Sequence, residues 1–150
     1  LRVGAATESE LIERYDRVDD ALHATKAAMQ EGILPGGGVA LVRASKQIEK
    51  EIRKEKNESI VSGMNVLKKA IIEPFKQIIR NGSSSPEAIL HKIIDTGDNV
   101  GYNSRTGEVG DMFAQGVLDP HKVVRCALEN SVSAAAMLLS VGCCMIDYEN

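Results

Sequence analysis

Three consecutive glycines separate two stretches of helical sequence, and they constrain the fold of this chain more than any other feature. We call residues 36–38 the glycine run; a long amphipathic segment precedes it and an apolar run, residues 39–42, follows it. Glycine adopts a positive φ without strain and lets a backbone approach a ligand closely. If Val39 begins a helix, the glycine N–H groups lie at a helix N-terminus, which attracts anions. The glycines alone leave a phosphate cradle and a plain loop both open, since no complete phosphate-binding motif occurs.

Composition narrows the classes of protein to which the chain can belong. It has 150 residues, of which 43% are hydrophobic and 26% charged, as in a folded globular domain. Only 3% are aromatic, so the core must be built from aliphatic side chains and methionine, which suits packed helices. The net charge of −3 disfavours a nucleic-acid-binding surface, and no apolar run approaches the roughly 20 residues that span a bilayer. We therefore expect no nucleic-acid partner and no membrane segment.

Cysteine and histidine usage indicates the compartment and argues against a metal site. The cysteines are Cys126, Cys143 and Cys144. An odd number with an adjacent pair is not a disulfide framework, so we expect a reducing compartment. The three histidines are scattered and share no ligand spacing with the cysteines, so no metal ligands are expected. Because the sequence begins with leucine and has no signal peptide, we expect a piece of a longer protein.

The first 32 residues predict one long helix. Thr7 and Glu10 have the spacing of a capping box, which predicts a helix over residues 8–31, and Gly32 is expected to end it. One apolar stripe runs along this helix: Leu11, Tyr15, Val18, Leu22, Thr25 and Met29. On its polar side, Asp19 and Asp20 point about 100° apart, so only one of them can face a given site. From spacing alone, both are ordinary solvated acids.

The middle of the chain predicts further helices. We expect a short helix over residues 38–45, then a charge-mixed run over residues 46–56 that forms a helix turn or an exposed loop. A helix starting near Ser59 should break at Pro74, which removes a backbone donor, and its continuation should stop at residues 81–82. Ser85 followed by Pro86 is typical of a helix start and predicts a helix over residues 86–96.

The remainder predicts a turn-rich insert and a final helix. Residues 96–110 are rich in turn formers, and residues 100–103 are expected to form a strand of a small hairpin, with a short helix over residues 108–115. Asp119 and Pro120 resemble the start of a last helix. Residues 143–146 are expected to form a terminal strand, whose unpaired edge would pair with another chain. The whole pattern predicts a mainly α protein with one or two short β segments.

Several motifs resemble one protein family in order and spacing. They are VGAATE (residues 3–8), RVDDALHAT (17–25), EG (31–32), GGGVAL (36–41), GYN (101–103) and LDPHKV (118–123). The chain resembles the group I chaperonins, the GroEL-type sixty-kilodalton heat-shock proteins, over essentially all of its length. This resemblance implies the C-terminal part of a much longer subunit. Residues 1–31 resemble the second segment of the intermediate domain, and residues 32–150 resemble the C-terminal half of the helical equatorial domain.

The resemblance implies an ATP site and assigns residues to it. Asp20 matches the catalytic aspartate that orients the water attacking the γ-phosphate. The remaining matches form the nucleotide-binding set: Gly37, whose backbone contacts the nucleotide, with Gly36 and Gly38 allowing its approach; Asn103 and Ser104, which line the adenine; Val117, which packs on the base; and Asp119, which accepts from the ribose hydroxyls. The family has a small apolar residue in place of Ser104. The cofactors implied are ATP and Mg²⁺, whose phosphate and metal ligands lie mostly in an N-terminal half that this sequence lacks.

The resemblance also implies partners and a location. These are identical subunits in a seven-membered ring, and a co-chaperonin lid and unfolded client proteins bound through an apical domain that this sequence lacks. The residues matching assembly contacts are Glu8, the pair Glu31 and Arg125, Lys76, and residues 85–87, where the family commonly has an acid at Ser85. The resemblance and the cysteine usage together fit a bacterial cytoplasm or a mitochondrial matrix.

Three functions remain open from the sequence. The first is a segment of an ATP-hydrolysing chaperonin that assists protein folding, in which this chain alone is inactive. The alternative is a non-catalytic oligomerisation module of a diverged or truncated chaperonin-like protein. A free-standing helical nucleotide-binding enzyme rests on the glycine run only. Apolar helix faces left uncovered predict that the isolated chain self-associates.

Overall fold

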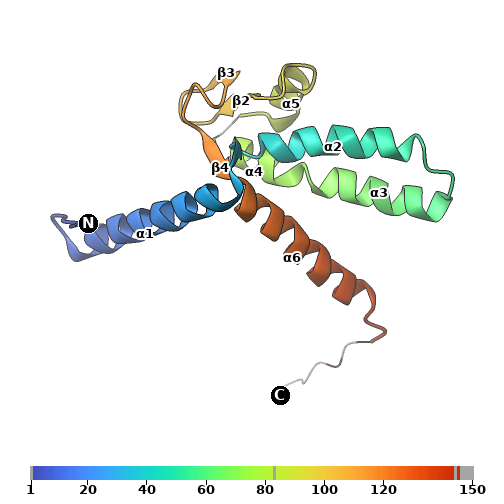
Figure 1. The fold of residues 1–150 in the computed structure, drawn as a ribbon, viewed down its shortest axis with the longest axis horizontal. Coiled ribbons are helices and arrows are strands. Elements are labelled where there is room, and N and C mark those ends of the chain that lie inside the picture. Colours follow the sequence, from blue (N-terminus) through green and yellow to red (C-terminus); the bar gives the residue numbers. More distant parts are fainter. Residues whose placement is uncertain (1, 83, 144, 146–150) are drawn as a thin grey trace. The chain divides into compact units, whose positions relative to one another are not determined.

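A computed structural model describes residues 2–82, 84–143 and 145 of the chain, which are mainly helical (Figure 1). The chain divides into two compact units. We call the described residues of 1–32 and 120–150 the two-helix unit, and residues 33–119 the core unit. Each unit is described by itself below.

The two-helix unit consists of α1 (Glu8–Glu31) and α6 (His121–Leu139), which pack against each other. Thr7 caps α1 as predicted: its hydroxyl accepts a hydrogen bond from the Glu10 N–H at 3.3 Å. The Glu10 carboxylate in turn accepts from the N–H of Ala6 at 3.3 Å. Gly32 follows the helix with a φ of 83°, so the predicted limits of this helix are confirmed.

The apolar stripe of α1 is not covered by α6. Tyr15 is 61% exposed and Met29 is 84% exposed. Of the stripe only Val18 is partly buried; the other partly buried positions of α1 are Glu10, Ala24, Ala27 and Ala28. Small side chains let another helix approach closely, so α6 lies against alanines while the long apolar side chains remain accessible. In the part of the chain that the structure describes, neither α1 nor α6 has a buried residue.

The predicted C-terminal strand is not formed by the residues that can be described there. Cys143 and Met145 belong to no strand. Cys144 and Ile146, the other two residues of that prediction, lie outside the described residues.

Two helices of the core unit run side by side, α2 (Val39–Ile52) and α3 (Glu58–Ala70) (Figure 1). The sequence predicted a helix ending at residue 45, which is wrong by two turns. The charged residues that suggested a loop continue α2, because they lie on its outer side and have partners there. Glu49 bonds Lys68 of α3 at 2.9 Å and Arg53 at 2.9 Å.

A proline separates the next two helices as predicted. α3 ends at Ala70 and α4 (Glu73–Asn81) begins with Pro74 at its second position. Gly82 ends α4, and α5 (Pro86–Ile94) starts at its proline with Ser85 in the N-cap position. The side chain of Ser85 makes no capping hydrogen bond. The helix predicted over residues 86–96 is therefore confirmed in place, two residues shorter.

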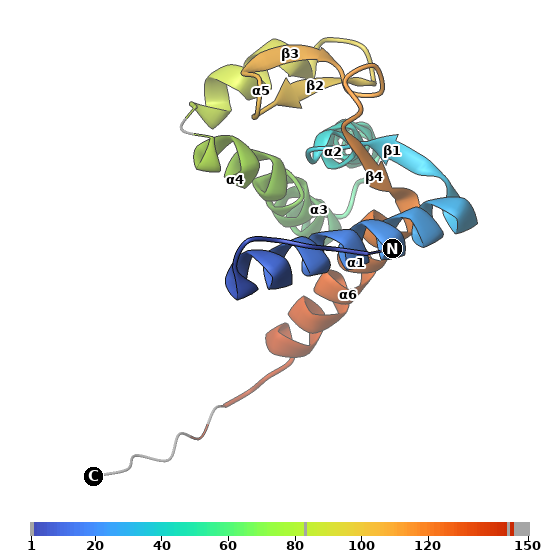
Figure 2. The same cartoon turned by 90° about the vertical axis from the view of Figure 1, so that its left-hand side faces the viewer.

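Four short strands complete the described fold. β2 (Val100–Asn103) and β3 (Glu108–Asp111) form an antiparallel hairpin in which Gly101 lies opposite Gly110. The hairpin confirms the first strand and shows that the short helix predicted over residues 108–115 is wrong. Gly107, with a φ of 77°, reverses the chain so that the following residues pair with β2. α5 lies alongside β2 (Figure 2).

The second strand pair joins segments far apart in sequence. β1 (Ile33–Pro35) pairs with β4 (Leu118–Pro120), whose first two residues belong to the core unit. The predicted helix start at Asp119 is therefore wrong. Strand pairing keeps residues 118–120 extended, so Pro120 takes the N-cap position and α6 begins at His121.

One hydrophobic core holds the core unit together. Its fully buried members come from α2, α4, α5, β2 and the turn after β3: Val39, Val42, Phe75, Ile79, Ile93, Tyr102 and Met112. This core fixes the start of α2, and with it the glycine run, against α4 and the hairpin.

Candidate functional site

Each glycine of the glycine run is required by the geometry at the start of α2. Gly37 and Gly38 have φ values of 68° and 79°, a region that L side chains rarely adopt. A Cβ on Gly38 would also lie 3.0 Å from the Cα of Phe75 in α4. α2 begins at Val39, so the condition on which the anion-site interpretation depended is fulfilled.

Gly36 is fixed by a different neighbour. Its N–H donates to the carbonyl of Val117 at 3.0 Å, and a Cβ on Gly36 would lie 3.0 Å from that same carbonyl group. A side chain at this position would therefore separate the glycine run from the segment that enters β4. The structure brings the predicted residues Gly36 and Val117 into contact, and Val117 is partly buried against the core.

Asp119 lies against the glycine run and not at the start of α6. The backbone N–H groups of Gly38 and Gly37 lie close enough to its carboxylate to favour the charged form. Burial raises the pKa of this carboxyl, and the two N–H groups lower it by less, so the net pKa lies above the usual value. Asp119 thus lies beside the start of α2, whereas the sequence predicted it as the cap of the last helix.

β2 passes the glycine run and ends at the predicted base-binding residues. The carbonyl oxygen of Tyr102 is 3.8 Å from the position that a Cβ on Gly37 would take. The side-chain oxygen of Asn103 accepts from the Arg105 N–H at 3.0 Å within the hairpin turn. The hydroxyl of Ser104 is buried without a hydrogen-bond partner, and Ser104 lies beside Gly82.

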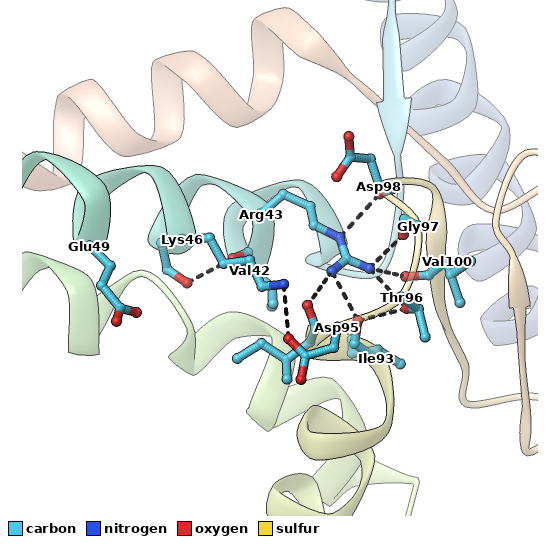
Figure 3. Close-up of polar contacts among 12 residues, drawn as sticks. Val42, Arg43, Lys46, Glu49, Ile93, Asp95, Thr96, Gly97, Asp98 and Val100 are labelled. Carbon is cyan, nitrogen blue, oxygen red and sulfur yellow. Dashed lines mark hydrogen bonds and ion pairs between the residues drawn. The ribbon is translucent and has the colours of Figure 1, made fainter.

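Arg43 has the densest set of polar contacts in the core unit, and no role was predicted for it from the sequence (Figure 3). From the second turn of α2, its guanidinium donates to the carbonyls of Ile93 and Ile94 at 2.9 and 3.0 Å. It also donates to the carbonyls of Gly97 and Val100 at 2.8 and 2.9 Å. Burial lowers the pKa of Arg43. The available signal was a lone charge directly after the apolar run of residues 39–42.

Asp20 lies on the exposed surface of α1, in the two-helix unit. His23 lies beside Asp19, the neighbour of Asp20: the His23 Nδ1 is 2.9 Å from the Asp19 backbone carbonyl and 3.5 Å from a carboxylate oxygen. Among the described residues Asp20 has no hydrogen-bond or ion-pair partner, so its carboxylate is available to water or a ligand. The structure therefore distinguishes the two adjacent acids, while the catalytic assignment of Asp20 remains a prediction.

The predicted pair of Glu31 and Arg125 is formed and joins α1 to α6. Arg125 donates from two nitrogens to the two carboxylate oxygens of Glu31, at 2.6 and 3.0 Å. His121 is 3.2 Å from the same carboxylate. The hydrogen bond from Arg125 is the largest cause that holds the pKa of Glu31 below its usual value. At the other predicted assembly region, Lys76 lies 3.4 Å from Glu87.

The predicted nucleotide residues thus fall into separate groups. Gly36 contacts Val117, Asp119 lies close to Gly37 and Gly38, and β2 passes Gly37 at Tyr102, the residue before Asn103. Within the described ranges, no group of three or more His, Cys, Asp or Glu side chains could hold a metal ion. An open, mainly apolar depression of about 590 Å³ lies elsewhere, along α1 and Val3. No described helix is long and apolar enough to cross a membrane.

Two comparisons with known proteins bear on the fold and the family of this chain. The model of the TCP-1/cpn60 chaperonin family matches residues 1–148. A crystal structure of a group III chaperonin in the open state superposes with a TM-score of 0.83 at 29% sequence identity. The match covers 95% of this chain and 30% of that chain, so this chain spans under a third of that chaperonin's length. It confirms the predicted mainly α fold of the chaperonin type. The chain belongs to the TCP-1/cpn60 chaperonin family.

Proposed function

We propose that the protein is an ATP-hydrolysing chaperonin of the group I type, to which this chain contributes a catalytic aspartate and part of the nucleotide site. The single observation that carries the proposal is the contact of Asp119 and Val117 with the glycine run. Family membership supports a chaperone role, and the motifs quoted from the sequence support group I. On this proposal identical subunits form seven-membered rings that enclose non-native proteins under a co-chaperonin lid, in a bacterial cytoplasm or mitochondrial matrix.

The residues of the core unit fit the ribose and base of a nucleotide better than its phosphates. Asp119 presents a half-buried carboxylate beside the Gly37 and Gly38 N–H groups, and its lone pairs can accept from ribose hydroxyls. Val117 offers an apolar surface and Asn103 an amide, the groups that suit a base. The negative charge of Asp119 beside the glycine N–H groups disfavours a phosphate at the same place. The glycine run therefore frames Asp119, and phosphate and Mg²⁺ would need ligands from elsewhere in the protein.

Asp20 would act as the acid–base group of the reaction. ATP bound with Mg²⁺ would supply the phosphoryl group that is transferred to water. An exposed carboxylate on a long, capped helix can hold and orient that water. The pairing of Asp19 with His23 leaves Asp20 as the free acid of the two.

The adjacent acids provide a matched test in the full-length protein. Asp20→Ala is expected to lower ATP turnover by about 10²- to 10⁴-fold while ATP binding persists, because a positioned general base contributes that much. Asp19→Ala, one position along the same helix, should leave turnover near the wild-type rate. Turnover, and ATP affinity by calorimetry, would be measured for all three proteins. If Asp20→Ala turns over at the wild-type rate, Asp20 is only a solvated acid.

The alternative is a non-catalytic oligomerisation module, and the uncovered apolar stripe of α1 favours it as a second candidate. The two functions predict different behaviour of the full-length wild-type protein. An oligomerisation module would form rings by light scattering and bind no ATP in calorimetry. Measurable Mg²⁺-dependent ATPase from the 150-residue chain alone would contradict the proposal that its active site is incomplete.

A further inference from the structure

Arg43 joins three segments of the core unit through a single guanidinium group (Figure 3). Besides the four carbonyls described above, it donates to the Asp98 carbonyl at 3.3 Å and the Thr96 hydroxyl at 3.3 Å. All five N–H donors of the guanidinium are thus engaged within residues 93–100. The Thr96 hydroxyl donates in turn to the Ile93 carbonyl at 2.7 Å, which ties the loop back to the end of α5.

These bonds satisfy the end of α5 and shape the loop that follows it. The carbonyls of a last helical turn lack partners within the helix, and a cation there is also favoured by the helix dipole. Arg43 supplies both a hydrogen-bond donor and a positive charge at the carbonyls of Ile93 and Ile94. The same fork holds the carbonyls of Gly97 and Val100, so the end of α5 and the first residue of β2 are fixed to one side chain.

The contacts of α2 also set the register of β2. Val39 and Arg43 are four residues apart and therefore lie on one face of the helix. Val39 lies so close to Gly101 that a Cβ on that glycine would collide with its side chain, while Arg43 bonds the preceding residue, Val100. Two consecutive residues of β2 are thus matched to two consecutive turns of α2. The first of those turns directly follows the glycine run.

We propose that Arg43 is a positioning residue for the nucleotide site: it holds β2, and with it Asn103, in register with the glycine run and Asp119. This inference rests on the proposed ATP-binding function. Lysine cannot replace the arginine, because an ammonium group donates from one nitrogen and cannot span carbonyls on both sides of a loop. The fork geometry, and not the positive charge alone, is therefore what the site requires.

The test uses Arg43→Lys in the full-length protein, with Arg53→Lys as the matched control. Arg53 ends the same helix, is exposed and pairs only with Glu49 among the described residues. We expect Arg43→Lys to speed amide exchange of residues 94–103 about tenfold or more, since several charge-assisted bonds are lost. We expect the ATP dissociation constant to rise about 10- to 100-fold, and turnover at saturating ATP to stay near wild type, because displaced binding groups weaken binding. Arg53→Lys should change none of these quantities.

Two outcomes would overturn the inference while the proposed function stands. One is wild-type exchange in Arg43→Lys. The other is faster exchange and a lower melting temperature at unchanged ATP affinity, which is the behaviour of a purely structural clamp. If Arg43→Lys does not fold by circular dichroism, Thr96→Val removes one acceptor of Arg43, together with the hydroxyl bond to Ile93. It should shift exchange and affinity in the same direction by less, and unchanged values there would also overturn the inference. Absence of ATP binding in the wild type would remove the proposed function and this inference together.

Discussion

Different interactions stabilise the interior of each of the two units. Every buried residue that the structure describes belongs to the core unit, where side chains from three helices and the hairpin enclose Phe75 and Met112. The two-helix unit has partly buried alanines and a bidentate ion pair instead. Burial of apolar area is the main source of stability. The core unit is therefore stabilised by its own hydrophobic core, whereas the two-helix unit gains little stability from burial.

The comparison teaches how little an apolar stripe alone says about burial. α1 and α2 both have apolar residues at helical spacing. Val39 and Val42 of α2 are fully buried, whereas Leu11 and Tyr15 of α1 are exposed. The difference lies in the partner that each helix meets, and α6 offers α1 only a short length of contact. The exposed stripe is therefore a surface that further protein is expected to cover.

The largest expected effect comes from truncating the core. Phe75→Ala should destabilise the core unit by about 3–5 kcal/mol, because it removes a fully enclosed aromatic ring and leaves a cavity. Leu11→Ala, on the exposed stripe of α1, should change stability by about 0.5 kcal/mol or less. Urea unfolding of the chain, followed by amide exchange of each unit, measures both. If Leu11→Ala costs as much as Phe75→Ala, the stripe is covered in solution and the comparison fails.

Two glycines with similar backbones sharpen the contrast. Gly38 and Gly32 have φ values of 79° and 83°, so alanine is strained at both. Only at Gly38 would the new Cβ also press on Phe75; no atom lies within 4 Å of it at Gly32. We expect Gly38→Ala to cost about 2–4 kcal/mol and Gly32→Ala about 1–2 kcal/mol.

Gly63 is the control for this pair, since it lies within α3 with open space around its Cβ position. Gly63→Ala should stabilise the chain by about 0.5–1 kcal/mol. Equal costs for Gly38→Ala and Gly32→Ala in thermal unfolding would show that contact with Phe75 adds nothing to the backbone strain.

The smallest expected effect concerns the ion pair of the two-helix unit. Arg125 lowers the pKa of Glu31 in the folded chain, so the pair stabilises the fold above the ordinary glutamate pKa. That contribution is lost as the pH falls through the lowered, folded pKa. Arg125→Ala should therefore flatten the acid dependence of the α1 and α6 helical signal and leave the core unit unchanged.

Carboxyl NMR titration measures this directly. In the wild type the Glu31 midpoint should lie below 4.5, and in Arg125→Ala it should move toward that value. High salt should reduce the difference, because both side chains are partly exposed. If the Glu31 titration midpoint is the same in the wild type and in Arg125→Ala, the pair is not formed in solution.

Much of the fold followed from local sequence, because its causes are local. Thr7 and Glu10 set the start of α1 and Pro74 separated α3 from α4, since caps and prolines act within a few residues. The charged residues after Ser45 misled the prediction, because their helical state depends partly on Lys68, a partner in another helix. The helix predicted over residues 108–115 was wrong for a similar reason: residues 108–111 form β3 only because β2 is there to pair with them.

The candidate site divides in the same way. Residue type alone predicted the need for glycine before Val39. It also predicted that the acids Asp19 and Asp20 of α1 are exposed to solvent. The partner of Asp119 was not, because pairing of β1 with β4 brings it to the glycine run from more than eighty positions away in sequence. The role of Arg43 was not predicted because most of its acceptors are backbone carbonyls. Every residue has a backbone carbonyl, so such acceptors cannot be identified from the order of side chains.

The sequence by itself determined the helices, their caps and breaks, and the family to which the chain belongs, because these depend on residue types at short spacing. Only the tertiary structure decided which apolar stripe is buried, that Asp119 lies beside the start of α2, and that Arg43 fixes β2 to the same helix. Those choices depend on segments that meet from opposite ends of the chain, where burial, close approach and hydrogen-bond geometry select the partner.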